Sequence, residues 1–126
     1  MGSACMENSK NDDYFVLKIV EHLSFIVQYM EKTKREEFDR NALLQDSMMF
    51  RLIQISENAR KLSDDYKEKH ADVPWLAMYG LRNRIVHDYG NVDLTIVYDT
   101  LVRDIPGLLK IIRDKVDCAE EKDSNE

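Results

Sequence analysis

Apolar residues recur at helical spacing along most of the chain. In residues 13–31 they follow the 3- and 4-residue steps of one helical face: Phe15, Val16, Ile19, Leu23, Ile26, Val27 and Met30. Leu17, Val20 and Phe25 widen this face. The pattern therefore predicts a first helix that is buried on two sides.

The middle of the chain predicts a second long helix and a short third one. A charged link over residues 32–40 precedes the second helix, which we expect over residues 41–62. Its apolar stripe is formed by Leu44, Met48, Leu52, Ile55, Ala59 and Leu62. After a polar, irregular segment over residues 63–73, Pro74 is well placed in the first turn of the third helix. The apolar face of that helix is predicted to consist of Trp75, Leu76 and Tyr79.

The last helix has clear signals at its start and in its interior. Gly90 can end the preceding helix, and Asp93 is a plausible N-cap for the next one. The apolar stripe that follows contains Leu94, Val97, Leu101, Ile105, Leu108, Ile112 and Val116. Because Pro106 cannot donate to the helical hydrogen-bond ladder, a kink or break is expected near Ile105.

These elements predict an all-α domain. No segment shows the alternation of a strand, and 33% charged residues with only 4 Gly and 2 Pro favour helices. A chain of 126 residues suits one domain. We expect a four- to five-helix up-and-down bundle over residues 13–118, between disordered tails at 1–12 and 119–126.

Charge and cysteine usage narrow the class of protein. The net charge is −6, and most of the excess lies in residues 1–13 and 119–126. This argues against broad affinity for nucleic acid but leaves room for a local basic site on the body. The first thirteen residues are polar, and no apolar run approaches the ~18 residues of a membrane span. With two cysteines in the chain, a cytoplasmic protein with reduced thiols is the expectation.

The segment 81–89 carries the most informative polar residues. Arg82 is followed after four residues by His87, and Tyr89 comes two positions later. Histidine can exchange a proton near neutral pH, and arginine holds a phosphate with a rigid fork of donors. Cleavage of a phosphodiester requires proton transfer and stabilisation of the added negative charge. RNA supplies its own nucleophile, the 2′-hydroxyl. The spacing by itself also fits a helix with a solvated arginine and a capping or core histidine.

Helical geometry constrains how these residues could cooperate. Positions five apart lie about 140° from one another around a helix, so Arg82 and His87 do not share a face. Asn83 lies on the face of His87, and Tyr89 lies on the face of Arg82. One copy of the motif makes a splayed site, whereas two copies about a two-fold axis could make a compact one.

Other polar and polarizable residues admit structural interpretations. Glu57 either faces the motif and orients Arg82 or is an exposed helical carboxylate. His22 is expected in the core or at its boundary, His70 in solvent, and two adjacent methionines in the core: Met48 and Met49. No His, Cys or carboxylate residues show a metal-ligand spacing, so no metal or cofactor is predicted.

The residues 82–89 resemble the Arg–four residues–His–one residue–Tyr motif of the HepT-like proteins in the HEPN superfamily. The similarity continues on both sides of the motif. It includes residues 51–59, 73–75 and 92–100, and the Asp-Ile-Pro break at 104–106. In total the resemblance covers roughly residues 14–113.

The resemblance implies an all-helical homodimer whose facing motifs form a metal-independent endoribonuclease site. Arg82 and His87 would be its catalytic pair, and Asn83 would be the polar neighbour that often follows the arginine of the family. Arg84, together with Arg82, would steer the approach of RNA. In this family the motif tyrosine, here Tyr89, can be adenylylated by an MntA-type nucleotidyltransferase antitoxin, which silences the toxin. The alternative is a non-catalytic HEPN domain that binds a nucleotide or docks a partner nucleotidyltransferase.

Overall fold

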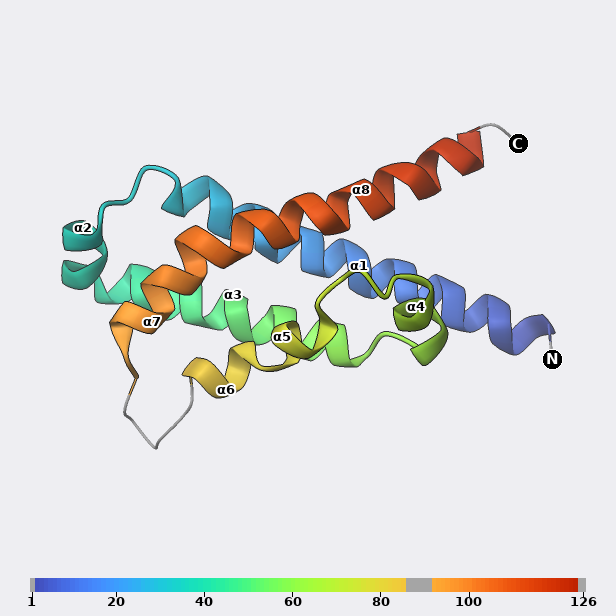
Figure 1. Cartoon of the computed structure of the whole chain (residues 1–126), viewed down its shortest axis with the longest axis horizontal. Helices are drawn as coiled ribbons and strands as arrows, with labels where there is room; N and C mark the ends of the chain where they lie inside the picture. Colours follow the sequence, from blue (N-terminus) through green and yellow to red (C-terminus); the bar gives the residue numbers. More distant parts are fainter. Residues whose placement is uncertain (1, 86–91, 125–126) are drawn as a thin grey trace.

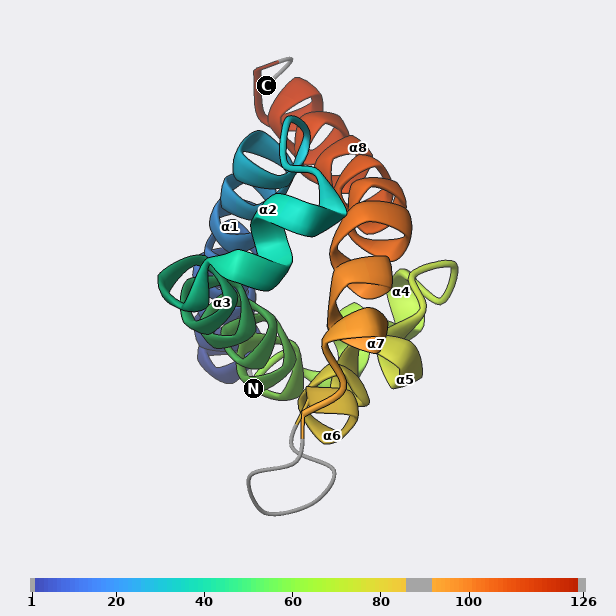
Figure 2. The same cartoon turned by 90° about the vertical axis from the view of Figure 1, so that its left-hand side faces the viewer.

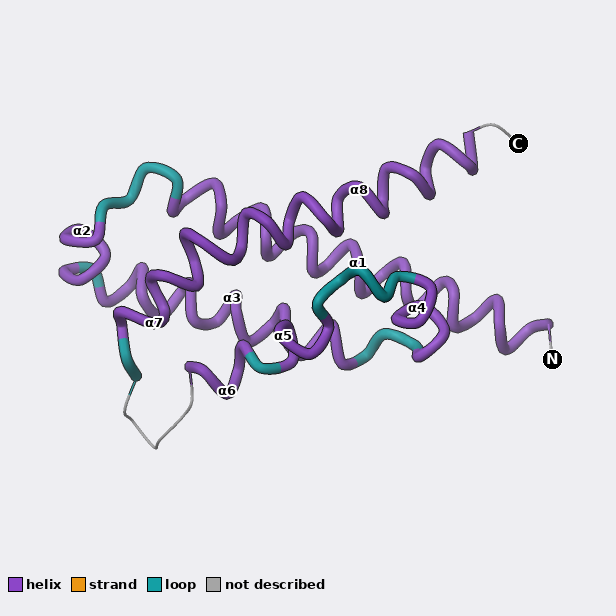
Figure 3. The backbone as a smooth tube through the Cα atoms, in the orientation of Figure 1, coloured by secondary structure: helices purple, strands orange, loops and turns teal. Residues whose placement is uncertain are grey.

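The computed structural model describes the backbone of residues 2–85 and 92–124, and the side chains of residues 11–85 and 92–116. These residues contain helices and no strand (Figure 3). The all-α prediction is therefore confirmed. The helices are α1 (Gly2–Met30), α2 (Arg35–Arg40), α3 (Ala42–Arg60), α4 (Asp64–Lys69), α5 (Trp75–Tyr79), α6 (Leu81–Ile85), α7 (Leu94–Asp99), the π-helical η1 (Thr100–Asp104) and α8 (Ile105–Ser124).

The long elements form an up-and-down bundle. Helix α1 runs the length of the molecule, α3 returns beside it, and α5 with α6 runs back in the direction of α1 (Figure 1). Helices α7 and α8 then return along the remaining side, so the two ends of the chain lie at the same end of the bundle (Figure 1). Helix α1 packs against both α3 and α8, which confirms its burial on two sides. The end-on view shows α6 at the lower edge of the bundle, between α3 and α7 (Figure 2).

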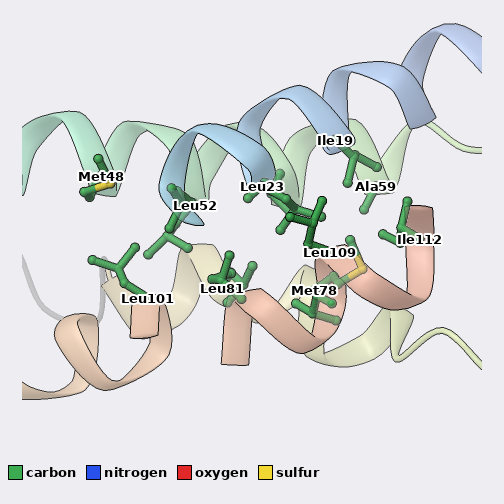
Figure 4. Packing of buried hydrophobic residues seen from close by; sticks show 14 of the residues in the cluster. Ile19, Leu23, Met48, Leu52, Ala59, Met78, Leu81, Leu101, Leu109 and Ile112 are labelled. Carbon is green, nitrogen blue, oxygen red and sulfur yellow. The ribbon is translucent and has the colours of Figure 1, made fainter. Parts of the chain in front are cut away.

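The predicted apolar stripes meet in one core. Side chains from six elements point into a shared interior (Figure 4), and they include Ile19, Leu23, Met48, Leu52, Ala59, Met78, Leu81, Leu101, Leu109 and Ile112. Full burial of a leucine or isoleucine side chain stabilises a fold by about 1.5–3 kcal/mol. Of the residues predicted to face the core, Leu17 does not: its exposed fraction is 56%. It lies on the side of α1 opposite the buried stripe, so the predicted face was too wide there.

Two short helices occupy segments predicted as links. The charged link over residues 32–40 contains α2, whose Phe38 is fully buried. The polar segment over residues 63–73 contains α4, and the Ser63 side chain caps that helix by accepting from Tyr66 N. Asp12 in turn accepts from Ser63 N at 2.8 Å and from Ser63 Oγ at 2.6 Å. The sequence did not predict either helix, because both segments are polar and show no apolar stripe. A single buried aromatic side chain or a capping contact is enough to stabilise six helical residues.

The short third helix begins at the predicted place but turns a different face to the core. Its start after Pro74 is confirmed, and the chain continues through Gly80 into α6. Leu76 is 84% exposed, whereas Met78 is fully buried. The predicted apolar face was therefore wrong at Leu76. Positions two apart on a helix point in nearly opposite directions, so burial of Met78 turns Leu76 outward.

The last helix continues past Pro106 without a break. Asp93 caps it as predicted, with Oδ1 accepting from Thr95 N and Ile96 N. The irregularity is a π-helical segment, Thr100–Asp104, in which Ile105 N donates to Thr100 O. A π-bulge lets the ladder change register just before a residue that lacks an N–H. The predicted irregularity near Ile105 is thus present, but as a local widening of the helix.

The two terminal helices are longer than the sequence predicts. Helix α1 starts at Gly2 and α8 ends at Ser124, so both extend into the segments expected as disordered tails, 1–12 and 119–126. Helix formers such as alanine, glutamate and lysine let α8 continue beyond its last core residue. At the other end, the contact of Asp12 with Ser63 ties α1 to the bundle. Despite these lengths, none of the described helices is both long and apolar enough to cross a membrane.

Candidate active site

Helix α6 presents three polar residues in a row because its two ends are buried. Leu81 and Ile85 are both 3% exposed, and they lie four residues apart on one side of the helix. The positions between them, Arg82, Asn83 and Arg84, are consequently all exposed. The local sequence therefore sets a cationic ridge on the surface of the bundle.

Arg82 is held against α3. Its Nη1 donates to Oε1 of Glu57 at 3.1 Å, which forms an ion pair across 25 positions of sequence. The Arg82 side chain is 56% exposed and the Glu57 side chain 36% exposed. The carboxylate thus faces the motif, in agreement with the first of the two interpretations of Glu57. An exposed pair of this kind contributes only about 0–1 kcal/mol to stability, so it positions Arg82 without hiding it from solvent.

Further contacts fix the approach of α6 to α3. The buried Ser56 donates from Oγ to the backbone oxygen of Tyr79 at 3.0 Å. The Arg60 side chain donates to the same oxygen at 3.4 Å. Tyr79 is the last residue of α5, two positions before α6 begins. These contacts anchor the turn that leads into the cationic ridge, and α6 follows in a defined position beside Glu57.

Arg84 points to the other side of the ridge. Its Nη1 donates to Oδ2 of Asp104 at 3.3 Å, with side-chain exposures of 53% and 54%. Residues two apart on a helix lie about 200° from one another, which explains why Arg82 meets α3 and Arg84 meets η1. Sequence reasoning missed Asp104 as a partner, because the contact spans twenty positions and depends on how α6 sits beside the π-helical segment.

Two of the predicted site residues belong to the segment that follows α6. His87 and Tyr89 lie in residues 86–91, outside the described residues. Asn83 is exposed, and its side chain forms no hydrogen bond with any residue that the structure describes. The structure therefore brings together Arg82 with Glu57 and Arg84 with Asp104. The pairing of Arg82 with His87 stays a prediction.

The other two histidines, His22 and His70, pack against neighbouring helices or side chains. His22 is 9% exposed, and its Nδ1 lies 3.0 Å from Arg51 Nη1 in the seam between α1 and α3. Burial, together with the Arg51 charge, lowers the pKa of His22 below its ordinary value. The expectation of a histidine in the core or at its boundary is confirmed. His70 differs from its prediction: it is half-buried, and its ring lies 4.4 Å from the ring of Tyr66, centroid to centroid.

Among residues 11–85 and 92–116, no three His, Cys, Asp or Glu side chains are close enough together to hold a metal ion.

The two methionines expected in the core are placed there, since Met48 is 1% exposed and Met49 is partly buried against the core.

Comparison with known proteins identifies the family of this helical domain. Residues 19–114 match the family model described as Ribonuclease HepT-like. This range contains both described ion pairs of α6, which join Arg82 to Glu57 of α3 and Arg84 to Asp104 of η1. No solved structure matches the chain significantly.

Three relatives illustrate the similarity. A protein of Caldanaerobacter subterraneus, whose name provisionally describes it as an RNase, is 27% identical over 76% of this chain and 86% of its own length. One from Methanocaldococcus jannaschii, named in the same way, is 28% identical over 88% of this chain and 92% of its own. The "Probable ribonuclease HepT" of Thermococcus cleftensis is 27% identical over 82% of this chain and 92% of its own. By the match to its model, this chain belongs to the HepT-like ribonuclease family of the HEPN superfamily.

Proposed function

We propose that this protein is a metal-independent endoribonuclease in which Arg82 binds the scissile phosphate of RNA. One observation carries the proposal: within a HepT-like ribonuclease fold, the Arg82 guanidinium is positioned by Glu57 at 3.1 Å, yet its side chain is 56% exposed. A guanidinium that is fixed on one side and open on the other can bind a phosphate by donating to its oxygens from the remaining N–H groups.

The proposed reaction uses the nucleophile that RNA already carries. The 2′-hydroxyl oxygen attacks the adjacent phosphorus, the bond to the 5′-oxygen breaks, and a 2′,3′-cyclic phosphate remains. Arg82 stabilises the negative charge that builds up on the phosphorane. His87 accepts the proton of the 2′-hydroxyl or donates one to the leaving 5′-oxygen, since an ordinary histidine pKa lies near neutrality. Arg84 steers the RNA backbone towards the cationic ridge.

RNA cleavage in the presence of a chelator tests this mechanism. The parent protein should cut a labelled RNA in EDTA and leave a 2′,3′-cyclic phosphate end. His87→Ala should lose about 10²–10⁴-fold in rate, the usual cost of removing a proton-transfer residue. Equal rates for the variant and the parent, or loss of parent activity in EDTA, would refute the mechanism. Absence of cleavage combined with specific nucleotide binding would instead favour a non-catalytic HEPN domain.

We further propose that the active form is a homodimer with the cationic ridges near its two-fold axis. Exposed apolar side chains on α3 support this arrangement: Leu43 is 82% exposed and Phe50 is 53% exposed. They lie at seven-residue spacing with Glu57, and hence on nearly the same face of α3. A second copy that covers this face would bring the two Arg82–Glu57 pairs towards each other, and each ridge would then complete the splayed site of the other.

Sedimentation at micromolar concentration tests the dimer. Phe50→Glu should convert the parent dimer to a monomer and reduce cleavage. Leu76→Glu is a matched control, because it places the same charge at an exposed leucine on α5. A monomeric parent, or dissociation by the control as readily as by Phe50→Glu, would contradict the proposed interface.

The regulatory part of the proposal concerns Tyr89. A partner nucleotidyltransferase of the MntA type would neutralise this protein by adenylylating Tyr89, as the resemblance to the HepT-like proteins implies. The added phosphate would compete with RNA for Arg82, and the nucleotide would block the cationic ridge. Tyr89→Phe removes the acceptor oxygen, so the variant should gain no adenylate mass and should stay toxic on coexpression. Adenylylation and neutralisation of that variant would exclude Tyr89 as the modified residue.

A further inference from the structure

A surface groove follows the side of α6 that faces away from Glu57. Its first hollow, about 400 Å³ in volume, lies between α6 and the α7–η1 segment. The lining residues are Arg84, Ile96, Asp99, Thr100, Arg103 and Asp104. A second hollow of about 390 Å³ shares three of these residues, Arg84, Arg103 and Asp104. The two hollows thus adjoin at the same pair of arginines.

The walls of the second hollow are largely apolar. Besides the three shared residues, α5, α6 and α8 contribute Ala77, Leu81, Leu108 and Ile111. In the first hollow, the apolar wall is Ile96, which is 45% exposed. The groove therefore has a charged middle between two apolar walls, a combination that suits a ligand with an anionic backbone and planar, weakly polar groups.

The two arginines in the middle of the groove differ in their pairing. Arg84 is bound to Asp104 at 3.3 Å, through a half-exposed pair that a ligand anion can displace at small cost. Arg103 is exposed and forms no ion pair with any described residue. The carboxylates of Asp99 and Asp104 reduce the net charge of the groove, which disfavours a free anion. Nucleobases, however, carry amino groups that can donate hydrogen bonds to such carboxylates.

We propose that this groove binds the RNA segment next to the cleavage site, with Arg103 and Arg84 contacting a backbone phosphate. The inference rests on the proposed ribonuclease function and adds Arg103 as a substrate-binding residue. Arg84 is two residues from Arg82 on the five-residue helix α6, with the exposed Asn83 between them. An RNA strand that crosses the cationic ridge therefore reaches both Arg82 and the groove, and the hollows receive its nucleobases.

Binding of an uncleavable RNA tests the proposal. A labelled 2′-O-methyl decamer lacks the attacking hydroxyl, so its anisotropy reports affinity alone. Arg103→Ala should weaken binding about fivefold and lower the slope of log Kd against log salt by about 0.7, the value for one lost phosphate contact on a single strand. An abasic oligomer of the same length should also bind more weakly than the decamer, because the hollows would stay empty.

The matched control is Arg113→Ala. Arg113 lies on α8 and is exposed, but it contacts Ser24 of α1 at 3.0 Å and so faces away from α6. The two variants lose the same charge from the same continuous helix. Equal affinities and equal salt slopes for the two variants would overturn the proposal, and so would a parent protein that does not bind the decamer.

Cleavage kinetics separate this inference from the proposed reaction. A dinucleoside monophosphate has a single phosphate, which must occupy the cleavage site and cannot also contact Arg103. Arg103→Ala should therefore reduce kcat/KM more for a cleavable decamer than for the dinucleoside. Equal reductions on both substrates would contradict the groove while leaving the ribonuclease function standing. Arg103-dependent binding without any cleavage would refute the ribonuclease function and retain the groove.

Discussion

Arg51 on α3 and Arg82 against α3 have the same side chain but different surroundings. Arg51 lies in the seam between α1 and α3, where its guanidinium contacts the His22 ring and lies 3.7 Å from the centroid of the Phe25 ring. Its Nε is buried without a hydrogen-bond partner among the described residues. Arg82 instead meets α3 from outside, through one exposed pair with Glu57.

The two arginines differ in how much of the guanidinium is open to a ligand. In the seam, the charge of Arg51 is shielded by helices and an aromatic ring, so removing it affects the packed interior. On the cationic ridge, Arg82 makes one shallow contact that contributes little to stability. A cation held in this way can bind a substrate phosphate without any loss of fold. Stability and activity should therefore respond to different arginines.

Within the comparison of these two arginines, the largest expected effect is on activity and comes from Arg82→Ala. Loss of a donor that stabilises the transition-state charge typically lowers the rate by about 10²–10³-fold. The midpoint of thermal unfolding should stay nearly unchanged, because the pair with Glu57 is exposed. Measurements of RNA cleavage and of Tm on the same variant check the predicted loss of activity and the predicted unchanged stability. A folded variant with parent activity would remove Arg82 from the site.

The converse change is Arg51→Met, which keeps an unbranched apolar stem. It removes the hydrogen bond to His22 and the contact with the Phe25 ring, so the free energy of unfolding should fall by about 1–3 kcal/mol. Urea unfolding measures this, and kcat/KM of the folded variant should match the parent. An unchanged or raised stability would mean that the cost of burying Nε outweighs both contacts.

A smaller effect on activity is expected for Glu57→Gln. The amide can still accept from Arg82 but has no charge, so the positioning of Arg82 weakens while its guanidinium stays in place. We expect kcat to fall about fivefold, corresponding to about 1 kcal/mol. Glu68→Gln is a suitable control, since Glu68 is an exposed glutamate on α4. If both variants behave alike, the contact of Glu57 with Arg82 has no role in cleavage.

The smallest expected effect is a pH dependence of stability that originates in His22. Burial and Arg51 lower the pKa of His22 in the folded state below its ordinary value of 6.5, against a weaker opposite effect of Glu21. The unfolded chain thus takes up the proton first as pH falls. The contribution of neutral His22 is present above about pH 6.5 and is lost as pH falls through the lower, folded-state pKa.

His22→Asn isolates this dependence. The asparagine oxygen can replace Nδ1 as the acceptor for Arg51 but does not titrate. Between pH 7.5 and pH 5.5 the Tm of the parent should fall more steeply than that of the variant. Identical profiles would show that groups other than His22 set the acid sensitivity of the fold.

Much of the fold follows from periodicity in the sequence. The apolar stripes of α1, α3 and α8 were predicted from 3- and 4-residue spacing, because each of these helices buries a continuous face. The N-cap at Asp93 and the start after Pro74 were also predicted, since both depend on local backbone chemistry. Short helices are different: α2 and α4 carry too few apolar residues for a stripe, and tertiary contacts with Phe38 and Ser63 form them.

At the candidate site, the sequence determined which residues are exposed on α6 but left their partners open. The spacing of Leu81 and Ile85 is enough to turn Arg82 and Arg84 outward, because four residues make about one helical turn. The pairing of Arg82 with Glu57 and of Arg84 with Asp104 depends on where α3 and η1 lie beside α6. Those positions follow from packing between segments that are distant in sequence, and no local pattern encodes such a contact. The tertiary structure alone therefore decided that Arg82 pairs with α3 and Arg84 with η1, and it formed the groove beside Arg103.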